Sequence, residues 1–94
     1  MSIRLRPWQQ LLIKGVKIEG VFVMNLSQED DYTFGRIKVM PHSEIPLHLH
    51  ENDCEWYLDE KTGELINFCP KGESHQFIND TDDTKYLLSI KKVV

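Results

Sequence analysis

Residues 46–55 read PLHLHENDCE, and this stretch decides which fold the chain is expected to adopt. Side chains alternate between the two faces of a β-strand, so His48 and His50 are expected to share one face, where they can grip one ion. Two histidines near a turn are more commonly just exposed, because polar residues concentrate at protein surfaces. Glu55 changes that interpretation. It follows His50 by five residues across a polar turn, so the next strand can return beside the first and place a carboxylate opposite the imidazoles.

A third imidazole comes from a separate stretch, residues 70–79, which reads PKGESHQFIN. Pro70 and Gly72 are typical of a tight turn, and His75 is expected at the beginning of the strand that follows it. Imidazole and carboxylate together suit zinc, iron, manganese, nickel or copper. The two stretches therefore supply the donor types from which transition-metal sites are built.

These stretches resemble the two sequence motifs of the cupin superfamily, in the order in which cupins carry them. The resemblance covers about residues 41–79, and the residues that carry it are His48, His50, Glu55, Pro70, Gly72, His75 and Asn79. It implies an all-β fold, a short cupin β-barrel of the double-stranded β-helix or jelly-roll type, RmlC-like and close to small cupin-2 domains. It also implies one divalent transition-metal ion (Fe, Mn, Ni, Zn or Cu). By similarity to the family, its ligands are His48, His50, Glu55 and His75.

The spacing between the motifs departs from the usual cupin pattern. The glycine that normally stands seven residues after Glu55 is Thr62 here, and Gly63 follows one residue late. A second glycine normally stands six residues before Pro70, where this chain has Glu64. Gly63 then serves both motifs, and the segment between them is almost absent. We therefore expect a barrel trimmed between the motifs, with one strand pair lost and the ligands undisturbed.

The rest of the chain alternates between short apolar runs and turn residues, which predicts a single all-β domain over residues 1–94. β-branched and aromatic residues crowd the runs, while Gly, Pro, Asn and Asp crowd the gaps. No window has a convincing helical stripe. The expected strands are residues 11–14, 17–26, 32–40, 45–50, 55–58, 64–68, 75–78 and 85–90. Residues 27–31 are expected to form a polar turn.

Composition and charge argue against several classes of protein. The formal net charge is −4 and the lysines are dispersed, so nothing indicates a nucleic-acid surface. No apolar run approaches the roughly 20 residues of a membrane span. Residues 1–7 are followed by neither the apolar stretch nor the cleavage site of a secretory signal. Two isolated cysteines, Cys54 and Cys69, are expected to be reduced, which makes a cytoplasmic location the expectation.

Four further side chains are weaker candidates for a substrate pocket: Tyr57, Phe77, Arg36 and Lys38. Tyr57 and Phe77 are expected on the faces that carry the ligands, but filling the core of a small barrel explains them equally well. Arg36 and Lys38 can bind a carboxylate or phosphate if they face the barrel interior. Their alternation with apolar neighbours fits a solvated sheet face better.

The resemblance leaves three functions open, because one fold hosts many chemistries. The first is a metal-dependent enzyme, of dioxygenase, lyase or isomerase type, acting on a small polar organic molecule, with dioxygenase chemistry preferred. The second is a non-catalytic cupin that binds a metal or small ligand for sensing, storage or regulation, an alternative favoured by the lack of a spare lid segment. The third is a module in which the metal only ties strands together. No independent nucleophile or triad is apparent, so no catalytic residue is named.

We also expect a homodimer. A barrel of this length exposes sheet edges and buries little of its own surface, and association relieves both deficits. The candidate interface residues are Leu11 to Ile13, Trp8 and Trp56. Cupins commonly pair by sheet extension, so the resemblance implies the same assembly.

Overall fold

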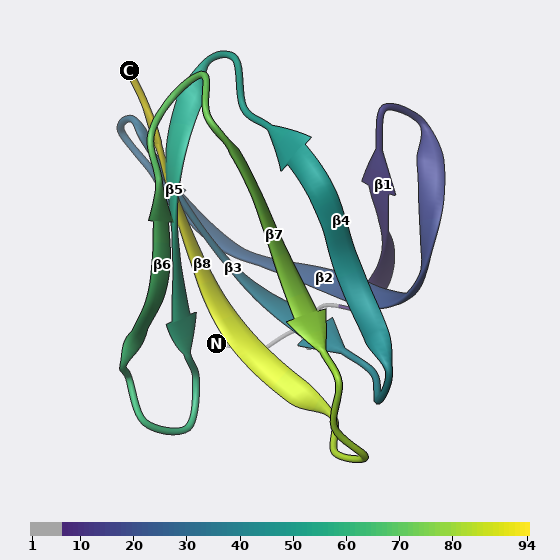
Figure 1. The fold of residues 1–94 in the computed structure, drawn as a ribbon. Coiled ribbons are helices and arrows are strands. Elements are labelled where there is room, and N and C mark those ends of the chain that lie inside the picture. Colours follow the sequence, from purple (N-terminus) through teal and green to yellow (C-terminus); the bar gives the residue numbers. More distant parts are fainter. Residues whose placement is uncertain (1–6) are drawn as a thin grey trace.

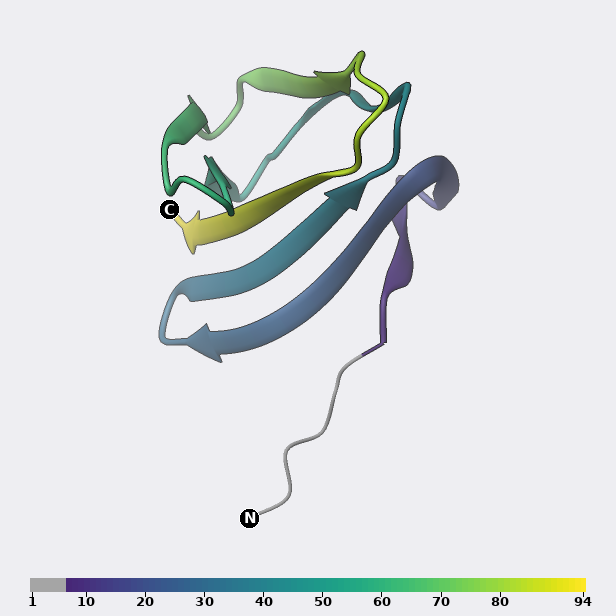
Figure 2. The same cartoon turned by 90° about the horizontal axis from the view of Figure 1, so that it is seen from below.

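The computed structural model describes residues 7–94, which form a six-stranded and a two-stranded antiparallel sheet (Figure 1). The strands are β1 (Gln9–Ile13), β2 (Val16–Glu29), β3 (Tyr32–Val39), β4 (Ser43–Leu49), β5 (Asp53–Asp59), β6 (Leu65–Cys69), β7 (Ser74–Asn79) and β8 (Lys85–Val93). The larger sheet has the order β1-β2-β3-β8-β5-β6, and the smaller one pairs β4 with β7. Seen from below, β4 and β7 form a second layer over β2, β3 and β8 (Figure 2).

This architecture agrees with the predicted all-β jelly roll, and every predicted strand is present. Residues 1–6, on which the expectation about a secretory signal depends, lie outside the described residues. Within residues 7–94, no helix is long and apolar enough to cross a membrane.

One predicted boundary is wrong. β2 continues to Glu29, through residues that the sequence analysis assigned to a turn, and the chain reverses at Asp30 and Asp31. Asp30 has a φ of 50°, a left-handed conformation that aspartate tolerates better than most residues. Polar residues continue the strand because this end of the β2–β3 hairpin is exposed, and backbone pairing, such as that of Gln28 with Thr33, is sufficient there.

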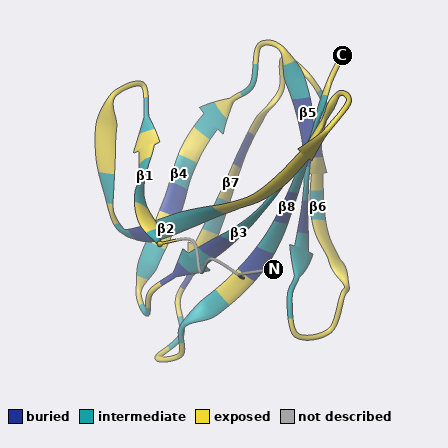
Figure 3. Ribbon diagram, turned by 180° about the vertical axis from the view of Figure 1, so that it is seen from behind, coloured by how far each residue is buried: buried dark blue, intermediate teal, exposed yellow. Residues whose placement is uncertain are grey.

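The hydrophobic core lies between the two sheets. Its buried members are Val21, Ile37, Val39, Ile45, Tyr57 and Leu87. Buried positions lie within the strands, up to the last residues of β3, β6 and β7, whereas most turns are exposed (Figure 3). Phe77 pairs with Ile45 across the smaller sheet and packs against this cluster. Phe77 therefore packs against the core, which is the alternative role the sequence analysis gave it, and its part in a substrate pocket stays a prediction.

Asn79, the last residue of the second motif, ties the end of β7 to the larger sheet. Its side chain is buried, and Nδ2 donates to the backbone carbonyls of Val39, Met40 and Asp83 at 3.1, 3.1 and 2.8 Å. Its Oδ1 accepts hydrogen bonds from the backbone N–H and the hydroxyl of Thr81. Since buried polar groups are costly unless they are hydrogen-bonded, this satisfied amide holds the β7–β8 connection against the end of β3.

A single hairpin links the strands of the two motifs. The β5–β6 loop closes when Oδ1 of Asp59 accepts hydrogen bonds from the N–H groups of Lys61 and Thr62, and Gly63 N–H donates to the Asp59 carbonyl at 2.7 Å. Between β5 and β7 the chain forms one strand, β6. The segment is thus as short as the sequence predicted.

The outer face of the larger sheet carries the two tryptophans assigned to a dimer interface. The ring centroid of Trp8 lies 6.2 Å from that of Tyr86, and Trp56 stacks on Phe68 at 4.9 Å. Tyr86 and Phe68 remain 41% and 45% exposed. Leu11 and Ile13 pack against the core instead, so of the predicted stretch only Leu12, 57% exposed, is well presented to a partner.

The homodimer stays a prediction, and we expect a light-scattering mass of twice the 11.1 kDa of the chain. We expect Trp56→Glu to shift the mass toward that of the monomer, because it would place a charge in an apolar contact. Leu47→Glu is the matched control, since Leu47 is 64% exposed on the smaller sheet. A monomeric wild-type mass would contradict the prediction.

Candidate metal centre

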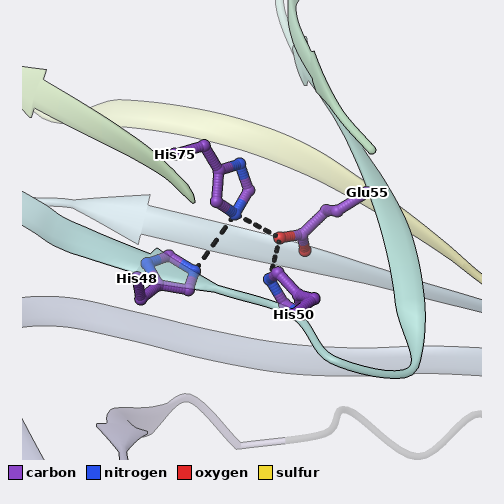
Figure 4. A group of neighbouring side chains, drawn as sticks. All are labelled: His48, His50, Glu55 and His75. Carbon is purple, nitrogen blue, oxygen red and sulfur yellow. Dashed lines mark hydrogen bonds and ion pairs between the residues drawn. The ribbon is translucent and has the colours of Figure 1, made fainter. Parts of the chain in front are cut away.

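Three strands bring the predicted ligands together. His48 lies on β4, His50 directly follows that strand, Glu55 lies on β5 and His75 lies on β7 (Figure 4). One potential ligand atom from each residue lies within 4.8 Å of the other three. Two stretches that are separate in the sequence therefore converge on one point at one end of the barrel.

The converging atoms are the Nε2 atoms of the imidazoles and Oε1 of Glu55. This oxygen lies 3.0 Å from His50 Nε2 and 3.2 Å from His75 Nε2. His48 Nε2 lies 3.1 Å from His75 Nε2. All three rings thus present the same nitrogen to the centre of the cluster.

Contacts on the far side of two rings determine which nitrogen carries the proton. His48 Nδ1 lies 2.7 Å from the carbonyl oxygen of Pro46, which can only accept, so this nitrogen is the donor. His50 Nδ1 lies 2.8 Å from Oδ1 of Asp53, and the same reasoning applies to the neutral ring. Each neutral Nε2 then presents a lone pair to the cluster. Partners of this kind orient histidine ligands in metal sites.

The cluster consequently places acceptors against acceptors. His50 Nε2 and Glu55 Oε1 are buried and have no hydrogen-bond partner within the described residues, although they lie 3.0 Å apart. A buried acceptor without a partner costs free energy. A single metal cation at the centre of the cluster would be bound by all of these lone pairs at once. The residues therefore fit a divalent transition-metal ion held by three nitrogens and one oxygen.

Glu55 is the charged member of this set and is 1% exposed. Burial by itself would raise its pKa, but the close imidazoles of His50 and His75, the charge of Lys91 and a hydrogen bond from Ser89 outweigh burial and lower that pKa. Ser89 Oγ donates to Oε2, and Lys91 Nζ lies 4.0 Å from the same oxygen. Glu55 is therefore an ionised ligand at neutral pH.

Tyr57 lies beside the cluster, on the face where the sequence placed it. Its ring stacks on His75, with centroids 4.7 Å apart and planes 19° from parallel. Burial, reinforced by the neighbouring charge of Glu55, raises the pKa of Tyr57, so the hydroxyl keeps its proton and serves as a hydrogen-bond donor to that carboxylate. Tyr57 thereby fixes the orientation of two ligands.

A cavity of about 270 Å³ adjoins the cluster. His48, His50, Glu55 and Tyr57 border it. Its apolar wall includes Leu11, Ile13, Val23, Ile37 and Ile45, and its polar wall includes Lys14, Thr33, Ser89 and Lys91. The β1–β2 hairpin supplies part of both sets of lining residues, so the cavity is bordered by both sheets and this hairpin.

The structure separates the two cations that the sequence offered as pocket residues. Arg36 borders the cavity, whereas Lys38 does not. The guanidinium of Arg36 makes two 2.7 Å hydrogen bonds to Glu60. Lys38 Nζ lies 4.8 Å from the centroid of the Trp8 ring. Neither cation is directed at a ligand in the cavity.

Two site residues, Ser89 and Lys91, were missed in the sequence. They share a face of β8 with buried Leu87, and they pair with Tyr57 and Glu55 respectively across the β5–β8 register. Alternation of polar residues after Leu87 was an available signal for a shared inward face. The pairing partner was not available from sequence spacing.

The pH dependence of metal binding follows from two opposite shifts. The Glu55 carboxylate beside it raises the pKa of His50 above its ordinary 6.5, whereas burial lowers the pKa of His48. Protons and metal compete for Nε2, so on acidification His50 protonates before His48. We expect affinity to begin falling above pH 6.5 and to collapse by about pH 5, with more than one proton taken up per ion released.

Competition titrations with a chromogenic chelator at a series of pH values measure this dependence. His42→Asn is the control, since His42 is exposed and contacts Asp82 at 2.6 Å away from the cluster. An affinity that does not change with pH would show that imidazoles do not provide the ligands.

Comparisons with known proteins agree on the architecture. No protein-family model and no curated protein matches the chain. A solved structure of a predicted oxalate decarboxylase from Thermotoga maritima is similar at a TM-score of 0.71, with 20% identity and coverage of 100% of both chains. KdgF from a Halomonas species matches at a TM-score of 0.72, with 11% identity over 94% of this chain and 86% of that one. A cupin-2 domain from Rhodospirillum rubrum matches at 0.64, with 13% identity, 98% of this chain and 74% of that one.

These likenesses establish the fold. The chain has the all-β cupin fold, and a cluster of histidines and a glutamate suited to a metal lies inside it. The resemblance that the two motifs predicted is confirmed at the level of the cupin fold.

Proposed function

We propose that this protein binds one divalent transition-metal ion through His48, His50, Glu55 and His75 and acts as a metal-dependent enzyme on a small organic molecule. The observation that supports this most directly is the convergence of three Nε2 atoms and one carboxylate oxygen beside a cavity of about 270 Å³. Four protein ligands leave about two positions of a six-coordinate ion for water or substrate. A bound ion would supply Lewis-acid or redox chemistry.

The surrounding side chains support catalysis by holding the ligands and excluding water. Ser89 and Tyr57 donate hydrogen bonds to Glu55 and so hold its carboxylate in place. The Ser89 hydroxyl bonds Oε2 and leaves Oε1 for the metal. Apolar residues on the β1–β2 hairpin and both sheets line the space beside the cluster. Dioxygenase-type chemistry is our first choice of reaction, with lyase or isomerase chemistry next.

Solved structures with the same fold include proteins described as enzymes. One is the predicted oxalate decarboxylase, and another is the polyketide cyclase RemF from Streptomyces resistomycificus, similar at a TM-score of 0.66 and 19% identity over 98% of this chain and 80% of that one. Their printed activities differ, so they support an enzymatic cupin without choosing the reaction.

Non-catalytic binding of a metal or small ligand is the second candidate, and one observation favours it. Tyr57 and Ser89, which border the cavity and could move a proton, both donate to Glu55. A base independent of the metal ligands is not apparent among the described cavity residues. Sensing or storage would need only a metal and an occupied cavity.

Cobalt-substituted protein tests the proposal. We expect one cobalt ion per chain and a change in its visible spectrum when azide is added, because the ion retains exchangeable positions. A bound but spectroscopically unresponsive cobalt ion would favour a metal that only ties strands together. Failure to bind cobalt, zinc, iron, manganese, nickel or copper would overturn the proposed function. Turnover of candidate substrates by the metal-loaded protein then separates an enzyme from a binding protein.

A further inference from the structure

We infer that the cavity takes a small carboxylate with a short apolar chain, and that Lys91 recognises its carboxylate. This inference rests on the proposed metal centre and adds the class of ligand that the site selects. It depends on the charges around the cavity, on the position of one lysine and on the apolar side chains that line the same cavity.

The charge around the cavity is positive although the chain as a whole carries −4. Within residues 7–94, the lysine, arginine and acidic side chains that border it are Lys14, Arg36, Glu55 and Lys91. Arg36 is committed to Glu60 by two hydrogen bonds. Glu55 is the sole carboxylate of the lining and is directed at the metal position. A divalent ion would leave the cavity with excess positive charge, which favours an anionic ligand.

Lys91 is placed to meet that anion. It pairs with Glu55 across β5 and β8, so both side chains project into the same space. Its Nζ lies 4.0 Å from Oε2, beyond hydrogen-bond distance, and its side chain is 41% exposed. The ammonium group therefore keeps its hydrogens available for a second acceptor. Lys14 is a weaker choice because it also borders a hollow that contains Glu51 and Asp53.

The apolar residues that line the cavity determine what the uncharged part of the ligand should be. Leu11, Ile13, Val23 and Ile45 present an apolar surface to the same cavity. At about 270 Å³, the cavity is near the lower end of the range for small-molecule sites. A short aliphatic chain would cover this apolar surface, whereas a ligand that is polar throughout would leave the surface without an apolar contact.

Pentanoate and its uncharged analogue pentanamide test the inference by calorimetry on zinc-loaded protein. We expect pentanoate to bind at least about tenfold more tightly than pentanamide, as charge-assisted hydrogen bonds allow. Lys91→Met should lose about tenfold in pentanoate affinity, keep one zinc ion per chain and bind pentanamide as the wild type does. Lys91→Arg should retain most of the preference.

Lys92→Met is the matched control. Lys92 is the next residue of β8 but faces outward, with Nζ 5.6 Å from the ring centroid of Tyr32, so pentanoate affinity should not change. Acetate should bind more weakly than pentanoate, because it leaves the apolar wall uncovered.

Equal affinities for pentanoate and pentanamide, or an unchanged pentanoate affinity in Lys91→Met, would overturn the inference while one bound zinc ion leaves the metal centre intact. Acetate binding as tightly as pentanoate would overturn the apolar part. Absence of zinc from the wild type would overturn the proposed function and this inference with it.

Discussion

Replacing His75 with alanine is expected to lower metal affinity by at least about 100-fold. Removing a group that only hydrogen-bonds to a metal ligand costs up to about 100-fold in affinity, and removing a ligand itself should cost at least as much. His75 is buried on β7 and is the single ligand from the smaller sheet's second strand. Its replacement removes one of the three imidazoles, so that β7 no longer contributes a ligand to the site. His48→Ala and His50→Ala are expected to have similar effects.

Glu55→Gln separates charge from coordination at the same centre. The amide oxygen can still coordinate, so we expect weakened binding rather than none. An amide accepts hydrogen bonds through its oxygen only, whereas the carboxylate accepts through both oxygens. Part of the hydrogen bonding that Ser89 and Tyr57 give to the Glu55 carboxylate would therefore be lost. The unfolding free energy should therefore fall by about 1–3 kcal/mol.

Metal stoichiometry measured on dialysed variants, with folding checked by circular dichroism, decides the ligand assignment. His42→Asn is the matched control, because His42 adopts a φ of 56°, which asparagine also tolerates, and its side chain is 63% exposed. Loss of metal in this control, with retention in His75→Ala, would show that the assignment is wrong.

The second large effect is expected from Gly20→Ala on stability. Gly20 lies within β2 at a φ of 77°, and a Cβ built there would lie 2.8 Å from Ser43 Cβ at the beginning of β4. Backbone strain costs about 1–2 kcal/mol and overpacking about 1–3 kcal/mol more. We therefore expect the unfolding free energy to fall by about 2–5 kcal/mol, measured by urea denaturation.

Gly63→Ala provides the control for backbone strain alone. Gly63 has the same φ of 77°, but a Cβ there would meet no atom within 4 Å. We expect its unfolding free energy to fall by only about 1–2 kcal/mol. Equal losses in the two variants would show that β4 yields to the added methyl group and that the close approach of β2 to Ser43 has little energetic weight.

The sequence by itself determined the strands and the candidate ligands, because both depend on local spacing. Alternation on a strand places His48 and His50 on one face, and a turn of a few residues returns Glu55 beside them. His75 was expected at the beginning of a separate strand, after the turn at Pro70 and Gly72, and the resemblance to a second motif joined it to the other three ligands. The structure then showed that these side chains do converge.

Only the tertiary structure decided which strands are neighbours and which face is inside. β8 pairs with β5, which brings Lys91 and Ser89 to Glu55 from more than 30 residues away along the chain. The packing of the smaller sheet over the larger one places Phe77 against the core, and the pairing with Glu60, a residue 24 positions away, holds the Arg36 guanidinium. Residue spacing determines which side chains share a face of one strand. It carries no information about which distant strand lies beside it, because that choice is made by burial and by hydrogen-bond pairing over the whole fold.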